Sequence, residues 1–162
     1  MNQLLVNIKF SVYNKLNLKI SEFQNELESK EYNACRFTLN GKKIISRTAK
    51  TTPKKIGLFV TFWKRPNQTE IAPLDSLDNF DFYIVNVSVQ NKIGQFVFPK
   101  SVLIKKGIVS TEQKEGKRGF RVYPTWDLPL SKQAQKTQKW QINYFYDINS
   151  SINLESVLEL YN

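Results

Sequence analysis

Residues 80–89, Phe-Asp-Phe-Tyr-Ile-Val-Asn-Val-Ser-Val, constrain the fold more than any other segment. Aromatic and β-branched side chains occupy both alternating faces of this segment, which is typical of a strand in the centre of a sheet. A turn at residues 91–94 leads into a second apolar strand at residues 95–98, which Pro99 ends. The sequence therefore predicts a sheet whose central strand is buried.

A β-hairpin is predicted upstream of this strand. Residues 35–39 and 43–47 alternate polar with apolar side chains on either side of Asn40-Gly41. This dipeptide favours a two-residue hairpin turn because both residues tolerate a positive φ. Two further strands are predicted at residues 57–63 and 120–123, and a loop at residues 66–78.

Helices are predicted at both ends of the chain. Apolar residues recur at helical spacing near the start, at Leu4, Leu5, Ile8 and Val12, and residues 23–31 suggest more helix. Ser131 is a suitable N-cap for a helix that continues to about residue 146. The predicted fold class is α+β: one domain over residues 1–162, with a central mixed, largely antiparallel sheet of five to six strands flanked by helices.

The amino-acid inventory excludes several kinds of active site. The chain has no histidine and one cysteine, Cys35, which excludes imidazole bases, Ser-His-Asp triads and Cys/His zinc sites. A single thiol cannot form an intramolecular disulfide, which is typical of a reducing cytoplasm, and we expect Cys35 to be inert core. No segment reaches the roughly 18 consecutive apolar residues of a membrane span, and the first residues lack a signal-peptide pattern. We therefore expect a soluble cytoplasmic protein.

The positive charge lies in two blocks. The chain has 24 Lys and Arg against 14 Asp and Glu, a net charge of +10. Residues 41–65 hold eight basic residues and no acidic one, residues 92–140 hold eleven basic and three acidic, and residues 66–91 between them hold four acidic alone. Converging blocks of this kind are typical of a surface that binds a polyanion. The alternative is that the lysines only keep the protein soluble.

Aromatic residues alternate with the cations, which favours nucleic acid over other polyanions because bases stack on aromatic rings. One alternative is that Arg121 pairs with Asp127 while Tyr123 and Trp126 are core. Another is that the lysines of the last predicted helix form only a solvated face. The candidate contacts to DNA or RNA are Lys54, Lys55, Lys64, Arg65, Lys117, Arg118, Arg121, Tyr123, Trp126, Lys132, Lys136 and Lys139.

Several strings resemble the MepB family of small bacterial proteins over roughly residues 28–146. The most specific are Gly-Gln-Phe-Val-Phe-Pro-Lys at residues 94–100 and Gly-Lys-Arg-Gly-Phe-Arg-Val-Tyr-Pro at residues 116–124. Others lie at residues 47–50, 52–57, 62–65 and 136–141. The resemblance implies a fold like that of restriction-endonuclease-type nucleases and a function in nucleic-acid binding. A binding protein of this kind requires no cofactor.

The same resemblance suggests a metal-dependent nuclease as an alternative. Such a centre needs carboxylates for Mg²⁺ or Mn²⁺ and a lysine beside the attacking water. Asp81 fits the position of the first carboxylate. On the next strand, however, Gln95 occupies the position of the second carboxylate and Val97 the position of the lysine. The substitutes would be Lys100 as the lysine, Glu31 from the N-terminal helix, and Asp75 or Asp78 as further metal ligands. A regulatory module that binds another protein is a third alternative.

Overall fold

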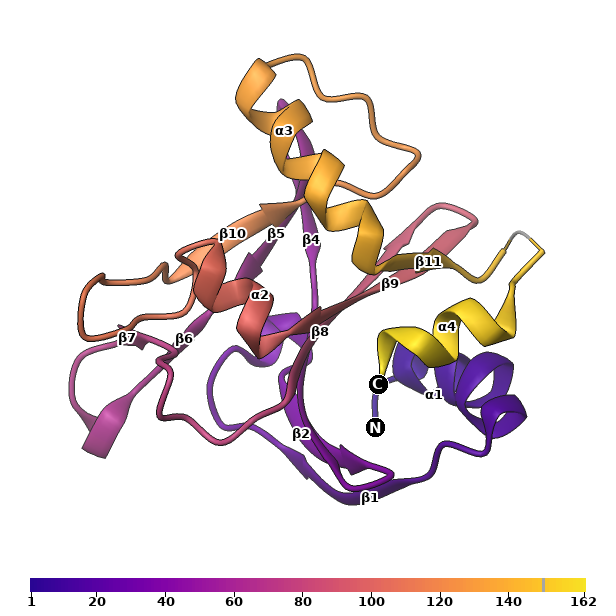
Figure 1. Ribbon diagram of the computed structural model, residues 1–162, viewed down its shortest axis with the longest axis horizontal. Helices are drawn as coiled ribbons and strands as arrows, with labels where there is room; N and C mark the ends of the chain where they lie inside the picture. Colours follow the sequence, from indigo (N-terminus) through magenta and orange to yellow (C-terminus); the bar gives the residue numbers. More distant parts are fainter. Residues whose placement is uncertain (150) are drawn as a thin grey trace.

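The computed structural model describes residues 1–149 and 151–162 and is built around a six-stranded sheet (Figure 1). The strand order is β1-β2-β3-β8-β9-β11, and every neighbouring pair is antiparallel except β3 and β8, which are parallel. This confirms the predicted α+β class with a mixed, largely antiparallel sheet. The strands are β1 (Ile20–Asn25), β2 (Cys35–Leu39), β3 (Lys42–Thr48), β8 (Phe82–Val89), β9 (Lys92–Pro99) and β11 (Phe145–Asp147).

Strand β8 lies in the interior of the sheet, as its apolar sequence predicts. Ile84 is paired with Ser46 of β3 on one side and Val97 of β9 on the other. Its successive side chains enter two separate cores: Tyr83 and Val85 belong to one, whereas Phe82 and Ile84 belong to the other. Both faces of the sheet are therefore covered.

The predicted hairpin is confirmed. Strands β2 and β3 pair antiparallel, with Leu39 opposite Lys42. The two residues between them, Asn40 and Gly41, have φ values of 47° and 83°. This is the left-handed backbone that a tight two-residue turn needs.

One face of the sheet is covered by the two ends of the described chain. Helix α1 (Gln3–Ile8) continues into a π-helical turn (Lys9–Tyr13) and a 3-10 turn (Asn14–Leu16), and α4 (Leu154–Leu160) lies beside it (Figure 1). Their apolar side chains pack with those of β2, β3, β8 and β9. We call this side the α1–α4 face.

The other face carries a second layer. A three-stranded sheet, β10-β5-β4, packs on it together with two helices. We call this side the α3 face. Its elements are β4 (Lys50–Thr52), β5 (Lys55–Thr61), β10 (Gly119–Val122), α2 (Lys100–Lys105) and α3 (Lys132–Gln141). Smaller elements connect them: a 3-10 turn (Lys30–Tyr32), β6 (Trp63–Lys64), another 3-10 turn (Pro66–Gln68), β7 (Ala72–Pro73) and a last 3-10 turn (Ile142–Tyr144).

Two predicted helices differ from the structure. The helix expected at residues 23–31 is wrong: residues 23–25 end the edge strand β1, which pairs with β2 from Ile20 opposite Leu39 to Asn25 opposite Cys35, and a loop leads from it to the 3-10 turn Lys30–Tyr32. The helix that begins after Ser131 ends at Gln141, not near residue 146, because Phe145 pairs with Phe96 of β9. In both cases pairing with the sheet overrides helical spacing. None of the helices in the described residues is long and apolar enough to cross a membrane.

Candidate nucleic-acid interface

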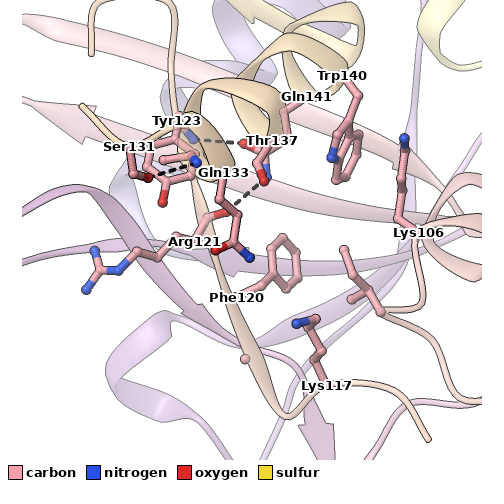
Figure 2. A pocket seen from close by; sticks show the side chains of 13 residues that line it. Lys106, Lys117, Phe120, Arg121, Tyr123, Ser131, Gln133, Thr137, Trp140 and Gln141 are labelled. Carbon is pink, nitrogen blue, oxygen red and sulfur yellow. Dashed lines mark hydrogen bonds between the residues drawn. The ribbon is translucent and has the colours of Figure 1, made fainter. Parts of the chain in front are cut away.

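Three adjoining pockets that share lining residues form one groove around α3, which we call the α3 groove. The part between α3 and β10 is a cavity of about 450 Å³ (Figure 2). No aspartate or glutamate is among the described residues that line the groove. Seven cationic side chains line it: Lys54, Lys55, Lys106, Lys117, Arg121, Lys136 and Lys139.

Helix α3 is fixed to β10 by a buried glutamine. The side chain of Gln141 accepts a hydrogen bond from the backbone N–H of Tyr123 at 2.9 Å and donates one to the carbonyl of Arg121 at 2.9 Å (Figure 2). At the other end of the helix, the Ser131 hydroxyl caps the backbone N–H of Ala134 at 3.0 Å, as predicted for this residue. Hydrogen bonds therefore fix helix α3, which forms one wall of the groove, at its C-terminal end and cap it at its N-terminal end.

The cation at the centre of the groove, Arg121, has no acidic partner. Its guanidinium donates to the Thr52 hydroxyl at 2.5 Å and to the Gly57 carbonyl at 3.4 Å, and no salt bridge in the described part of the chain involves it. The alternative pairing with Asp127 is therefore not formed. Burial raises the pKa of the Asp127 carboxyl, while the charge of Lys92 acts in the opposite direction.

Two aromatic rings line the α3 groove at different points. Trp140 has the Lys106 ammonium 5.3 Å from its ring centroid, and the two lie on the opposite side of the cavity from the Arg121 guanidinium (Figure 2). The ring of Tyr123 lies against Gly57, where an added Cβ would come within 2.6 Å of it. Gly57 also has a φ of 86°. Both the Tyr123 ring and this left-handed backbone therefore exclude a larger residue at position 57.

Trp126 and Lys132 are predicted contacts that do not line the groove. Trp126 packs edge-on against Phe145, with 5.6 Å between ring centroids, and its indole Nε1 is buried without a hydrogen-bond partner. Lys132 is exposed at the start of α3. Packing of Trp126 against the core matches the alternative given for this residue.

Three of the predicted cations have acidic partners and lie outside the groove lining. Lys64 contacts Asp75 at 2.7 Å and Asp78 at 2.9 Å. Partial burial alone would lower the pKa of Lys64, but the hydrogen bonds and charges of the two aspartates raise it, and the Lys64 hydrogen bond lowers the pKa of Asp75. The other two pairs are Arg65 with Glu28 at 3.1 Å and Arg118 with Glu115 at 3.0 Å.

The sequence predictions missed Lys106. It caps the C-terminal end of α2, a helix of only six residues, which is too short to show a helical period in the sequence. The signal that could have found it is the pair Lys105-Lys106 before Gly107, since lysines and a positive-φ glycine are typical of a helix C-terminus.

Gln95, the proposed second position of a nuclease centre, lies in the interior of the α1–α4 face. It is fully buried, and its side-chain oxygen accepts hydrogen bonds from the hydroxyls of Tyr146, at 2.6 Å, and Tyr161. Its amide donates to Asn86 at 2.8 Å, and the Tyr161 and Tyr13 hydroxyls are 2.9 Å apart. We call these five side chains the tyrosine network.

Asp81 and Lys100 lie at the opposite end of the same strands. Gln95 is opposite Asn86 in β8, five residues after Asp81, so about 17 Å of strand separates them. The Asp81 carboxylate accepts from the backbone N–H of Lys43 at 2.8 Å, and its carbonyl accepts from the Lys100 N–H at 3.0 Å. Glu31 is exposed on the 3-10 turn Lys30–Tyr32, not on a helix.

Asp75 and Asp78 come together, but a cation of the chain lies between them. The Lys64 ammonium contacts both carboxylates, and the Lys100 ammonium donates to the backbone carbonyl of Asp78. Among the described residues, no three carboxylate or thiol side chains form a group that could hold a metal ion. Mg²⁺ is bound in proteins through one or two carboxylates and several waters, so at this place it would have to displace the Lys64 ammonium from the two aspartates.

Comparison with known proteins gives the family. A family model described as MepB-like matches residues 26–147. The chain belongs to the MepB-like family. This confirms the resemblance seen in the sequence. The α3 groove, whose lining lies between residues 54 and 143, falls entirely within the matched range, whereas α1 and α4 fall outside it.

Two solved structures are similar to the chain. The crystal structure of MepB has a TM-score of 0.81 and 33% sequence identity, and the match covers 93% of this chain and 100% of that one. A bacterial homing endonuclease, I-Ssp6803I, has a TM-score of 0.46 and 15% identity over 86% of each chain. A search of curated proteins found no match.

Proposed function

We propose that this MepB-like protein binds nucleic acid in the α3 groove. The observation that carries the proposal is the gathering of positive charge on one concave surface. Seven cations line the groove, and no carboxylate is among its described lining residues. The predicted contacts Lys64, Arg65 and Arg118 lie outside this lining and have acidic partners.

Unpaired cations on a concave surface favour a polyanion for a physical reason. Each phosphate neutralised by a lysine or arginine releases condensed counterions, and this release supplies most of the affinity of sequence-independent binding. Arg121 can also present a planar fork to a phosphate. Trp140 and Tyr123 offer ring surface on which a base can stack, worth about 1–3 kcal/mol per base.

The test is a titration of fluorescent single- and double-stranded DNA and RNA oligonucleotides in EDTA at several salt concentrations. We expect the combined change Lys106→Gln, Lys117→Gln and Arg121→Gln to weaken binding to every sequence. The slope of log K against log salt should fall by about 2–3, since each lost phosphate contact removes about 0.7–0.9.

A matched control removes the same charge elsewhere. Lys15, Lys19 and Lys30 are exposed and lie outside the groove lining, so changing all three to glutamine should leave the slope nearly unaltered. Equal losses in both triple variants would mean that only net charge matters. No binding at low salt would refute the proposal and favour a protein-interaction module.

The same samples test the nuclease alternative. Mg²⁺ and then Mn²⁺ are added to the complexes, and the products are separated on a denaturing gel. Intact products agree with a binding protein. Fragments that disappear with Asp81→Ala or Asp75→Asn would show a metal-dependent nuclease instead.

A further inference from the structure

The loop between β10 and α3 exposes two leucines. Leu128 is 80% exposed and Leu130 is 86% exposed, whereas Pro129 between them is buried. The buried proline anchors the segment and leaves both leucine side chains in solvent. Two apolar side chains held two residues apart on one loop offer a small contact surface.

Hydrogen bonds from α3 hold this loop in place. The side-chain amide of Gln138 donates to the carbonyls of Pro124, at 2.9 Å, and Asp127, at 2.8 Å. The amide of Gln135 donates to the carbonyl of Pro129 at 3.0 Å. The leucines are therefore presented from a fixed backbone, so little conformational entropy is lost when they make a contact.

Leu130 lines the α3 groove beside three of its cations. It shares a pocket of the groove with Pro129, Lys54, Lys55 and Arg121, and Leu128 lies two residues before it on the same loop. In Figure 1 the loop and the turn between β4 and β5 both reach the N-terminal end of α3, at the top of the view. A nucleic acid whose phosphates contact these three cations lies beside Leu130.

We propose that Leu128 and Leu130 form an apolar wedge that enters an open base step, so that the groove prefers duplexes with interrupted stacking. This inference rests on the proposed function and names the form of nucleic acid that the groove takes. Apolar side chains inserted between base steps unstack them at a cost of a few kcal/mol. The cost is least where pairing or stacking is already broken, as at a gap or a mismatch.

The test compares two DNA duplexes of the same length and sequence, one continuous and one with a single-nucleotide gap, in EDTA with the full chain. We expect the gapped duplex to bind about 10-fold more tightly, a difference of about 1.4 kcal/mol. Changing both Leu128 and Leu130 to serine should remove this preference. The salt slope for the continuous duplex should stay the same, because the cations are intact, and the affinity for the continuous duplex should fall less than the affinity for the gapped one.

A second readout follows the base itself. With 2-aminopurine beside the gap, wild-type protein should raise the fluorescence as the base unstacks, and the double leucine variant should not. The matched control changes Leu27 and Leu77 to serine, since these leucines are 86% and 93% exposed and lie outside the groove lining. Both readouts should be unaltered in the control. All four positions are exposed, so the variants should fold.

The outcomes separate the wedge from the groove. Binding without a gap preference, or a preference that survives the leucine changes, would overturn the wedge and leave the groove intact. Absence of all nucleic-acid binding would overturn both. Leucine-dependent binding to phosphatidylserine vesicles, with nucleic-acid binding unaltered, would also overturn the wedge and assign the leucines to a membrane surface.

Discussion

Two polar clusters on opposite faces of the six-stranded sheet differ in what satisfies them. In the tyrosine network on the α1–α4 face, the hydroxyls of Tyr146 and Tyr161 and the amide of Gln95 are buried and bond to one another. In the α3 groove on the other face, Arg121 and Lys117 stay accessible, and no carboxylate is among the described residues of the lining. The network satisfies its polar groups inside the fold, whereas the groove leaves its cations accessible to a ligand.

This contrast separates stability from binding. A buried polar group that loses its partner costs the folded state the full desolvation penalty. An unpaired surface cation costs little because water solvates it. Changes in the tyrosine network should therefore lower the free energy of unfolding, and changes in the α3 groove should lower affinity.

The largest expected effect comes from alkaline pH. Burial raises the pKa of Tyr13 from 10.0 to about 12, and burial also raises the pKa values of Tyr146 and Tyr161. The folded state keeps these phenols neutral while the unfolded state ionises them, so stability is complete below pH 10 and is lost as the pH rises towards 12. At about 1.4 kcal/mol per pKa unit, Tyr13 alone accounts for about 3 kcal/mol.

Absorbance at 295 nm and near-ultraviolet circular dichroism check this together. The phenolate signal of the buried tyrosines should appear only as the circular dichroism signal is lost. If all seven tyrosines ionised gradually while the protein stayed folded, the tyrosine network would not be buried from water as described.

An intermediate effect is expected from Gln95→Leu. Leucine has a similar size but accepts no hydrogen bond, so the Tyr146 hydroxyl and the Asn86 side-chain oxygen lose a partner inside the core. We expect a loss of about 2–4 kcal/mol in the free energy of unfolding, measured by urea denaturation. Affinity for nucleic acid should change less than about twofold. A stability loss below about 1 kcal/mol would show that the network is replaceable.

The smallest effect should come from Glu115→Gln, which frees Arg118 near the groove. The pair is largely exposed, with the two side chains 49% and 66% accessible, so the free energy of unfolding should change by less than about 0.5 kcal/mol. Affinity at low salt should rise about twofold. Glu159→Gln on α4 makes the same change of charge on the other face, and an equal gain there would remove the distinction between the faces.

Local patterns predicted the centre of the sheet but not its edges. The alternation of side chains in β8 and the Asn40-Gly41 turn each depend only on neighbouring residues, so the sequence alone predicts them. Strands β1 and β11 form because β2 and β9 offer them partners. The helical spacing of the apolar residues around them did not show these pairings, which depend on partners distant in the sequence.

The site was predictable in composition but not in detail. The positive blocks and the residues Lys117 and Arg121 were identified from charge and aromatic spacing. Lys64 forms ion pairs with Asp75 and Asp78 because the chain folds back between residues 64 and 78. These pairs make Lys64 unavailable to a ligand. The role of Gln95 depends on Tyr13, 82 residues before it, and Tyr161, 66 residues after it. Such distant partners leave no local signal.

The contact between Tyr13 and Tyr161 joins residues 148 positions apart. During translation, the core of the α1–α4 face can therefore close completely only after almost the whole described chain has left the ribosome. The part of this core that α4 covers stays open for that interval, and contacts this distant in sequence form slowly. A nascent chain halted before residue 161 should consequently be a good substrate for chaperones that bind exposed apolar helices.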